Sequence, residues 1–199
     1  MALKKEDLYG LEQYSEMRSS FRARVMEHKK NRGVAIGPNA SLYFEDRLTI
    51  QYQIQEMLRI EKIFDAAGIN EELDTYNPLI PDGNNWKATF MIEFTDEDKR
   101  RDALAAWIGI KKSVWMQVGE YEKVFAIANE DLQRDNERKT SAVHFMRFQL
   151  SDDMVTATCE GLPISAGIDL PLYNYDQKPL PDNIQATLRA DLDECSDTL

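Results

Sequence analysis

The fold of this protein is decided by residues 44–64, which read FEDRLTIQYQIQEMLRIEKIF. At about 100° per residue, its apolar side chains gather into one sector of a helix, formed by Ile50, Ile54, Met57, Leu58 and Phe64. Glu61 falls near the middle of this sector, and Gln53 falls inside its edge. The stretch therefore predicts a long amphipathic helix from about Asp46, with a carboxylate on its apolar side.

An ionised carboxylate in an apolar sector is unfavourable unless it is protonated, paired or turned towards a polar cavity. Three interpretations of Glu61 follow. The first is a buried ion pair with an arginine of the preceding helix, namely Arg18, Arg22 or Arg24. The second is a polar ligand or metal cavity. The third is simple exposure, if the helix packs through a different face.

The cavity interpretation joins Glu61 to Gln53, Glu56 and His144 as a candidate polar pocket. Gln53 and Glu56 are three residues apart and can meet on a neighbouring helix face. His144 lies in SAVHFMRFQL on an apolar strand face, so it is either a ligand or general base, or a core histidine bonded to a backbone carbonyl. As metal ligands, Glu61, Glu56 and His144 would suit iron, manganese or zinc; the cofactor itself is not identified by the sequence.

The standard motifs of several enzyme classes are missing from the sequence. It contains no G-x-G-x-x-G, no G-x-x-x-x-G-K-[ST] and no G-x-S-x-G. The residues three before the two histidines are Val25 and Ser141, which excludes the paired Glu-x-x-His motif of ferritin-like di-iron sites. Two distant cysteines exclude a zinc or iron–sulfur site held by this chain alone. Cys195, in a polar tail, is expected to be exposed, and a disulfide with Cys159 is not expected in a cytoplasmic protein.

The net charge of −11 argues against nucleic acid as a partner. The charge is uneven, because residues 1–32 carry +3 and the remaining residues carry −14. The basic segment is either a docking patch for an acidic partner or the solvated, cation-rich end of a helix. No apolar run approaches the roughly 18 residues needed to cross a bilayer, and the first residues lack the apolar region of a secretory signal. We therefore expect a cytoplasmic protein without a membrane partner.

The periodicity of the chain predicts an α+β protein. Residues 1–77 are expected to be a helical region, with one helix from Leu8 to Asn31 and a second that ends at AAGIN, near Gly68. GVAIGPNAS is expected to be a turn-rich link and EELDTYNPLIPDGNN a loop.

Residues 86–199 are expected to be β-rich, with one internal helix in TDEDKRRDALAAWIG and a C-terminal helix in IQATLRADLDE. The predicted strands lie in WKATFMIEF, SVWMQVG, KVFAIA, SAVHFMRFQL and MVTATCE, whereas PLYNYDQKPLPDN is expected to be irregular. The predicted architecture is N-terminal long helices packed on a mostly antiparallel sheet or small barrel, in two regions or in one integrated domain.

FEDRLTIQYQIQEMLRIEKI, followed by DTYNPLIP, KATFMIEF and SAVHFMRF, resembles a bacterial family known as domain of unknown function 3501. The likeness extends from about Phe21 to the last strand, and its most specific part is Gln53 to Arg59. The resemblance implies no activity, cofactor or catalytic residue. It does imply genes for rubrerythrin-like and iron–sulfur proteins nearby, and hence a redox or oxidative-stress setting.

Three functions fit these observations. The favoured one is a non-enzymatic accessory or binding protein that acts beside a redox protein partner. The second is a metal-dependent enzyme or sensor that uses Glu61, Gln53, Glu56 and His144. The third is a small-molecule-binding protein whose pocket lies between the long helix and the sheet.

Overall fold

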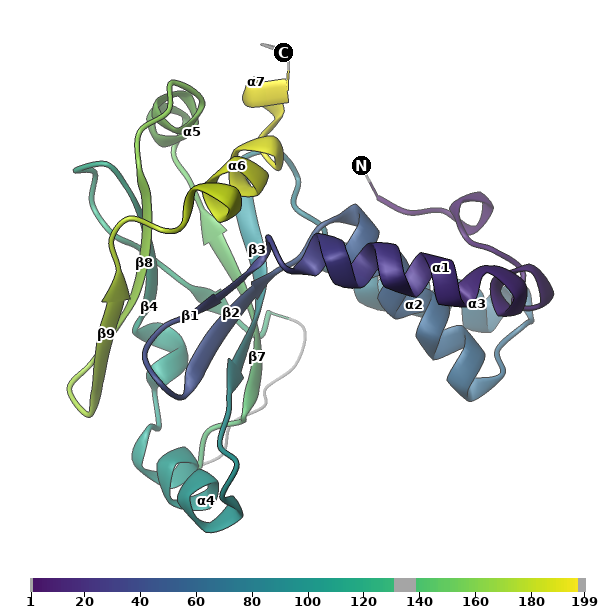
Figure 1. Cartoon of the computed structure of the whole chain (residues 1–199), viewed down its shortest axis with the longest axis horizontal. Coiled ribbons are helices and arrows are strands. Elements are labelled where there is room, and N and C mark those ends of the chain that lie inside the picture. The colour runs from purple at the N-terminus through teal and green to yellow at the C-terminus, as the bar shows by residue number, and fades with distance from the viewer. Residues whose placement is uncertain (1, 131–138, 197–199) are drawn as a thin grey trace.

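A computed structural model describes residues 2–130 and 139–196. It consists of two antiparallel β-sheets with helices around them and a helical arm that projects from one side (Figure 1). The predicted α+β class is confirmed. In the part of the chain that is described, neither sheet closes on itself, so the predicted small barrel is not found. No described helix is both long enough and apolar enough to cross a membrane.

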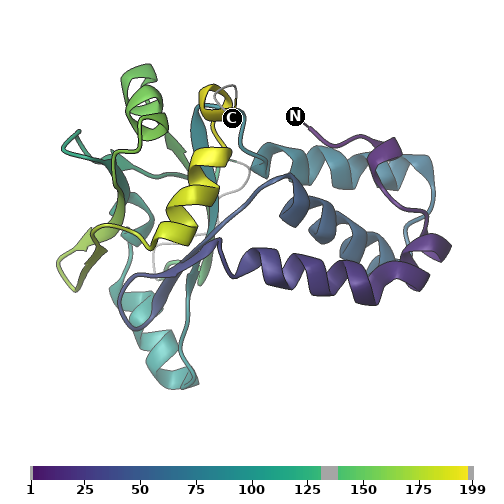
Figure 2. The same ribbon diagram turned by 45° about the horizontal axis from the view of Figure 1, so that its top comes forward.

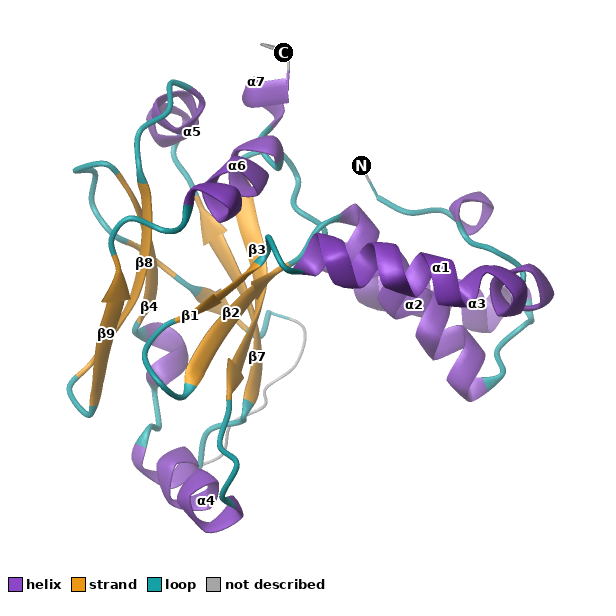
Figure 3. Cartoon of the chain, in the orientation of Figure 1, coloured by secondary structure: helices purple, strands orange, loops and turns teal. Residues whose placement is uncertain are grey.

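The two sheets differ in size (Figure 3). The five-stranded sheet has the order β1-β2-β3-β7-β6, with β1 (Gly33–Ala35), β2 (Ala40–Phe44), β3 (Asn85–Ile92), β7 (Val143–Gln149) and β6 (Ile127–Ala128). The four-stranded sheet has the order β5-β4-β8-β9, with β5 (Val124–Phe125), β4 (Val114–Val118), β8 (Ile164–Leu170) and β9 (Tyr173–Gln177).

The main hydrophobic core contains side chains of both sheets. Alternate residues of β3, including Trp86 and Phe90, are fully buried on one face, as a period of two requires. They belong to one cluster with Met116 of β4 and Ala166 of β8. The opposite face of β3 carries Thr89 and its neighbours, which border a cleft between the sheet and the arm.

Four helices flank the sheets: α4 (Glu97–Ala106), α5 (Asp152–Cys159), α6 (Asp182–Ala190) and α7 (Asp193–Ser196), with a 3₁₀ turn η3 (Ile110–Lys112) before β4. The predicted internal and C-terminal helices correspond to α4 and α6. MVTATCE was expected to be a strand and is helical instead. Ser151 caps this helix by accepting a hydrogen bond from the Met154 amide, and two aspartates in the first turn favour it further.

The helical arm is formed by α1 (Leu11–Lys29), α2 (Arg47–Glu61) and α3 (Ala66–Tyr76), with 3₁₀ turns η1 (Lys5–Asp7) and η2 (Asn77–Leu79). It projects from the five-stranded sheet in both ribbon views (Figures 1 and 2). The arm has two small clusters of its own, separate from the main core; one centres on Ile54 and the other on Phe21. The division into domains at residues 77–86 stays a prediction.

Several predicted boundaries around the arm are wrong. The second helix ends at Glu61, because Lys62 takes a left-handed conformation with a φ of 56°. A separate helix, α3, begins at Ala66 and covers the first part of the segment expected to be a loop; Asp65 caps it by accepting a hydrogen bond from the Gly68 amide. The expected turn-rich link is a hairpin of β1 and β2, and part of the expected irregular segment is β9.

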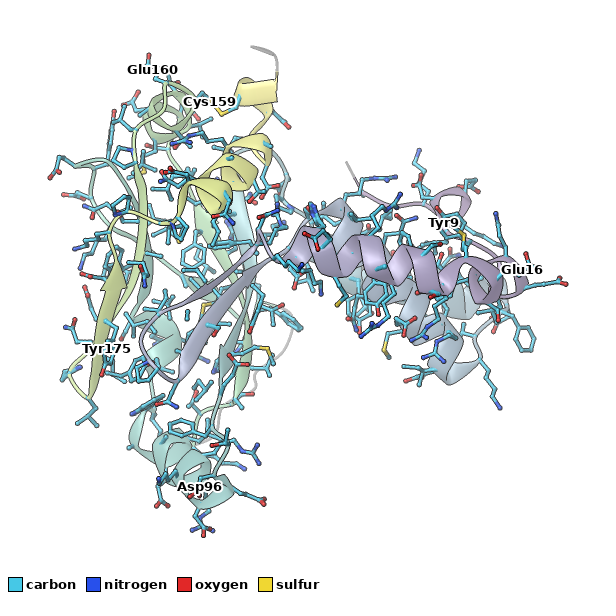
Figure 4. The ribbon with its side chains drawn as sticks, viewed as in Figure 1. Tyr9, Glu16, Asp96, Cys159, Glu160 and Tyr175 are labelled. Carbon is cyan, nitrogen blue, oxygen red and sulfur yellow. A yellow bond between two sulfur atoms is a disulfide. The ribbon has the colours of Figure 1, made fainter. Side chains whose placement is uncertain are left out.

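Cys159 and Cys195 form a disulfide that joins α5 to α7, with their Cα atoms 4.9 Å apart. Figure 4 shows Cys159 at the end of α5 that lies beside α7. The prediction of an exposed Cys195 without a structural role is therefore wrong. The two cysteines are 36 positions apart, and their meeting depends on how α6 returns the chain to α5.

Candidate functional site

A cleft of about 430 Å³ lies between the arm and the outer face of the five-stranded sheet. The sheet contributes Tyr43, Glu45, Thr89, Met91, Val143 and Phe145 to its lining. The arm contributes Met26, Lys29, Thr49, Ile50, Gln53, Tyr76 and Leu79. The lining is therefore mostly apolar and aromatic, with one carboxylate, one ammonium and one amide.

Strand pairing places the sheet residues of the cleft in rows. Thr89 of β3 is paired with Tyr43 of β2 on one side and with Phe145 of β7 on the other. Met91 and Val143 are paired in the next row. Because side chains alternate between the faces of a strand, all five lie on the face opposite to the main core.

The carboxylate of Glu45 is held by two hydroxyl groups. The Thr89 hydroxyl donates to Oε1 at 2.6 Å, and the Thr49 hydroxyl donates to Oε2 at 2.6 Å. One hydroxyl comes from the sheet and the other from α2, so Glu45 ties the two walls of the cleft together. Both carboxylate oxygens already accept hydrogen bonds.

A second hollow of about 410 Å³ adjoins the cleft and shares Leu79 and Phe145 with it. Its remaining lining is Pro78, Asp82, Lys87, Ile127, Glu130, Met146 and Arg147. The Arg147 guanidinium donates two hydrogen bonds to Glu130, at 2.9 and 2.7 Å. The second hollow is therefore the more charged of the two.

The arm joins the sheets through Arg32, which is buried. Its guanidinium donates to the carbonyl oxygens of Phe44 and Glu45, both at 2.9 Å. It also forms ion pairs with Asp191 at 2.5 Å and with Asp46 at 3.3 Å. One cation thus connects the end of β2, the start of α2 and the end of α6. We call Arg32 and these partners the arginine junction. Because Arg32 binds the Glu45 carbonyl, the junction holds the backbone at the wall of the cleft that Glu45 lines.

The two aspartates of the junction differ in their electrostatics. Burial raises the pKa of Asp191 to about 6, although the Arg32 charge lowers it. Burial would also raise the pKa of Asp46, but the Arg32 charge and the Thr49 amide bring it below its usual value. His28 Nε2 lies 2.5 Å from Asp46 Oδ2 and adds a further hydrogen bond there. The ionised form of Asp46 is therefore the favoured one.

A family described as Protein of unknown function (DUF3501) matches residues 2–192 of the chain. The chain belongs to the DUF3501 family. A crystal structure of a novel protein of unknown function from Burkholderia pseudomallei is similar to this DUF3501 protein at 49% sequence identity, with a TM-score of 0.92. The match covers 97% of this chain and 100% of that chain. No curated protein matches this chain. The resemblance expected from the Gln53–Arg59 region is therefore confirmed.

Glu61 is exposed in this DUF3501 protein, at the last residue of α2. Of the three interpretations, the structure agrees with exposure: Glu61 is not in apolar surroundings, and Arg18, one of its three suggested partners, pairs with Glu56 instead. Glu61 shares the helical angle of the buried Ile54, seven residues earlier, but it is the last residue of α2 and lies beyond Leu58, the last buried residue of that helix. Burial of Glu72 on α3 raises its pKa, and the nearby negative charge of Glu61 raises it further.

The other three predicted site residues lie in different surroundings. Gln53 lines the cleft. Glu56 accepts hydrogen bonds from Tyr14 and Arg18 within the arm. His144 is fully buried on the core face of β7, where its ring nitrogens lie 3.0 Å from Thr140 Oγ1 and Asn129 Nδ2.

The four residues therefore do not converge on one pocket. Within residues 2–130 and 139–196, no group of three or more His, Cys, Asp or Glu side chains is placed to hold a metal ion.

Sequence reasoning missed most of the cleft. Lys29, Glu45 and Thr89 gave no motif, because the groups that meet there come from α1, from the residue after β2 and from β3. The one available signal was the second face of β3 and of its partner strand β7. Met91 and Phe145 are large apolar residues at positions that alternation assigns to solvent, and such side chains on an outer face indicate a covered or ligand-binding surface.

Proposed function

We propose that this protein is a non-enzymatic binding protein and that its ligand lies in the cleft between the arm and the five-stranded sheet. The observation that carries the proposal is the lining itself. An aromatic and methionine-rich wall meets Lys29, Glu45 and Gln53 in about 430 Å³, a volume typical of ligand pockets, which span roughly 300–1,000 Å³. The lining fits a molecule with an aromatic or aliphatic body and a polar end.

The state of the ionisable groups supports binding rather than catalysis. The two threonine hydroxyls hold the Glu45 carboxylate in one orientation and leave a lone pair on each oxygen for a hydrogen-bond donor of a ligand. His144 points to the core on the opposite face of the sheet, and His28 is hydrogen-bonded to Asp46 at the arginine junction. The polar groups of the cleft are thus suited to orienting a ligand.

A titration with anilinonaphthalene sulfonate, which has an apolar aromatic body and a negative end, tests the proposal. The wild-type protein should bind one equivalent with saturation. Val143→Trp should fill the cleft and weaken binding by about tenfold or more, which corresponds to about 1.4 kcal/mol. Ala35→Trp is the matched control, because Ala35 is exposed on the same sheet but does not line the cleft.

Two results would contradict the proposal. One is equal affinity of the dye for Val143→Trp and for the wild type, with circular dichroism showing that the variant is folded. The other is an equal loss of affinity in Ala35→Trp, which would mean that the dye binds to the sheet surface in general.

We further propose that the protein acts beside a redox protein partner. The support for this setting is the family resemblance, together with a pair of cysteines close enough to form a disulfide. Cross-linking of the tagged protein in its own host should identify a thiol, iron–sulfur or di-iron protein. If only proteins of other classes are cross-linked, the redox setting is wrong, while ligand binding in the cleft is still decided by the dye titration.

A further inference from the structure

A second surface, on the arm and outside the cleft, has features of a binding site. A hollow of about 690 Å³ lies along α1 and is bordered by one residue of α2. Its lining is Ser15, Arg18, Ser19, Arg22, Ala23 and Arg59. We call it the basic hollow. Its small residues are four apart on α1 and share one helix face, so their short side chains leave space between the arginines.

The basic hollow carries an excess of positive charge. Glu56 is the acid beside it, and it accepts two hydrogen bonds from Arg18, at 2.7 and 2.8 Å, and one from Arg59 at 3.2 Å. Arg22 has no ion-pair partner among the described residues and is exposed. Three guanidinium groups therefore face one carboxylate, which leaves about two positive charges unbalanced.

The arginines of the basic hollow are partly held in place before any partner arrives. The paired carboxylate fixes Arg18 in a bidentate geometry, while its side chain is still 36% exposed. The Arg59 side chain is 39% exposed. Each guanidinium has five N–H donors, so both keep donors for a further acceptor. A planar guanidinium in a fixed position is well suited to a second carboxylate.

The charge of the rest of the chain limits what can bind. The protein has a net charge of −11, and residues 33–199 carry −14. A long polyanion such as nucleic acid would extend from the basic hollow over acidic surface and be repelled. A short acidic segment would contact only the arginines. We propose that the basic hollow binds a carboxylate-rich segment of a partner protein, independently of the ligand in the cleft.

Fluorescence anisotropy with a labelled peptide of alternating Glu and Gly tests this proposal. The wild type should bind the peptide with an affinity that falls as salt is added, and should not bind the matched Gln and Gly peptide. Arg22→Glu should weaken binding by about fivefold, since one exposed charge contact is worth up to about 1 kcal/mol. Arg22 is chosen because its replacement leaves no buried partner unpaired. Arg101→Glu on α4 is the control, with the same change of charge at a 70% exposed side chain.

Three results would overturn the proposal. Peptide affinity of Arg22→Glu within twofold of the wild type would exclude the basic hollow. An equal loss in Arg101→Glu would show a general charge effect. Tighter binding of a single-stranded oligonucleotide than of the peptide, lost in Arg22→Glu, would assign the surface to nucleic acid. Sedimentation velocity completes the test, because a wild-type oligomer that dissociates in Arg22→Glu would show that a second copy of the chain occupies the hollow.

Discussion

At the scale of single residues, two glutamates of α2 differ sharply although they lie on one helix. Glu56 is inside the arm, where its side chain is 14% exposed and accepts hydrogen bonds from Tyr14, Arg18 and Arg59. Glu61 is exposed at the end of the helix. Glu56 and Glu61 differ by about 140° around the helix, but Glu61 has nearly the same angle as the buried Ile54, so its position at the end of α2 is what leaves it solvated.

We expect Glu56→Gln to lower the free energy of unfolding by about 1–3 kcal/mol, because Arg18 loses its bidentate partner and is itself partly solvated. Glu61→Gln, the matched control, should change it by about 0.5 kcal/mol or less. Urea denaturation of both variants measures the difference. Equal changes in the unfolding free energy of the two variants would mean that the contacts of Glu56 stabilise the fold no more than the solvated position of Glu61 does.

The stability should also depend on pH through Glu56. Its hydrogen bonds with Arg18, opposed by burial, hold its pKa at about 2, below the ordinary 4.5. A carboxyl whose pKa is lower in the folded state stabilises the fold above the unfolded pKa, and this stabilisation is lost as the pH falls from about 4.5 towards 2. The difference in unfolding free energy between the wild type and Glu56→Gln should therefore shrink over that window. A difference that stays constant down to pH 2 would contradict the assignment.

Gln55 is a polar residue of α2 whose side chain is buried. It is fully buried, and its side chain bonds to the backbone of Tyr9, accepting from the amide at 2.5 Å and donating to the carbonyl at 3.2 Å. Its helical angle is outside the sector that the apolar residues define. The sequence could not indicate this residue, because the buried side of α2 is widened by the N-terminal segment that packs against it.

At the scale of elements, the caps of the helices were partly predictable. Asp46 was correctly placed at the start of α2, where it accepts from the Thr49 amide at 2.8 Å. Asp65 caps α3 in the same way, accepting from Gly68 at 2.9 Å. Only Asp46 has a second role, because it also meets Arg32 and His28 at the arginine junction.

This difference gives a matched pair of substitutions. Asparagine caps a helix about as well as aspartate, so Asp65→Asn should change the free energy of unfolding by about 0.5 kcal/mol or less. Asp46→Asn keeps the cap but removes the charge beside Arg32, and should cost about 1–3 kcal/mol. Thermal and urea unfolding would measure both. A neutral Asp46→Asn would show that the charge at the junction contributes little.

Local signals failed where neighbours overrode them. MVTATCE contains β-branched residues that favour a strand, yet Ser151 and two acids start a helix there. The segment after α2 looked like a loop because of its prolines, but these lie after Tyr76, beyond the end of α3. Both errors come from weighing composition above the capping residue.

At the scale of the whole molecule, Arg32 is a buried polar link between the arm and the sheets. Arg32→Lys keeps the charge but cannot reproduce the fork that reaches Phe44, Glu45, Asp46 and Asp191 together. We expect it to lower the free energy of unfolding by about 1–3 kcal/mol, and Arg32→Leu to lower it by about 3–5 kcal/mol.

The same variants should change how firmly the arm is held. Spin labels at Glu16 on the arm and Asp98 on α4, both exposed, report the distance between the two parts. The distance distribution should be narrow in the wild type and broader in Arg32→Leu. An unchanged distribution in Arg32→Leu would show that apolar packing alone orients the arm.

The amino-acid sequence alone determined the α+β class, the helices α1, α2, α4 and α6, the strands β3, β4 and β7, and the family, because periodicity, capping residues and local motifs are properties of neighbouring residues. The tertiary structure alone decided the cleft, the arginine junction, the disulfide and the exposure of Glu61. Three consecutive residues depend on both sequence and tertiary structure. Phe44 enters the core, Glu45 lines the cleft and Asp46 caps α2. Their order is local, but the groups that each one meets come from distant parts of the chain, and only packing brings those parts together.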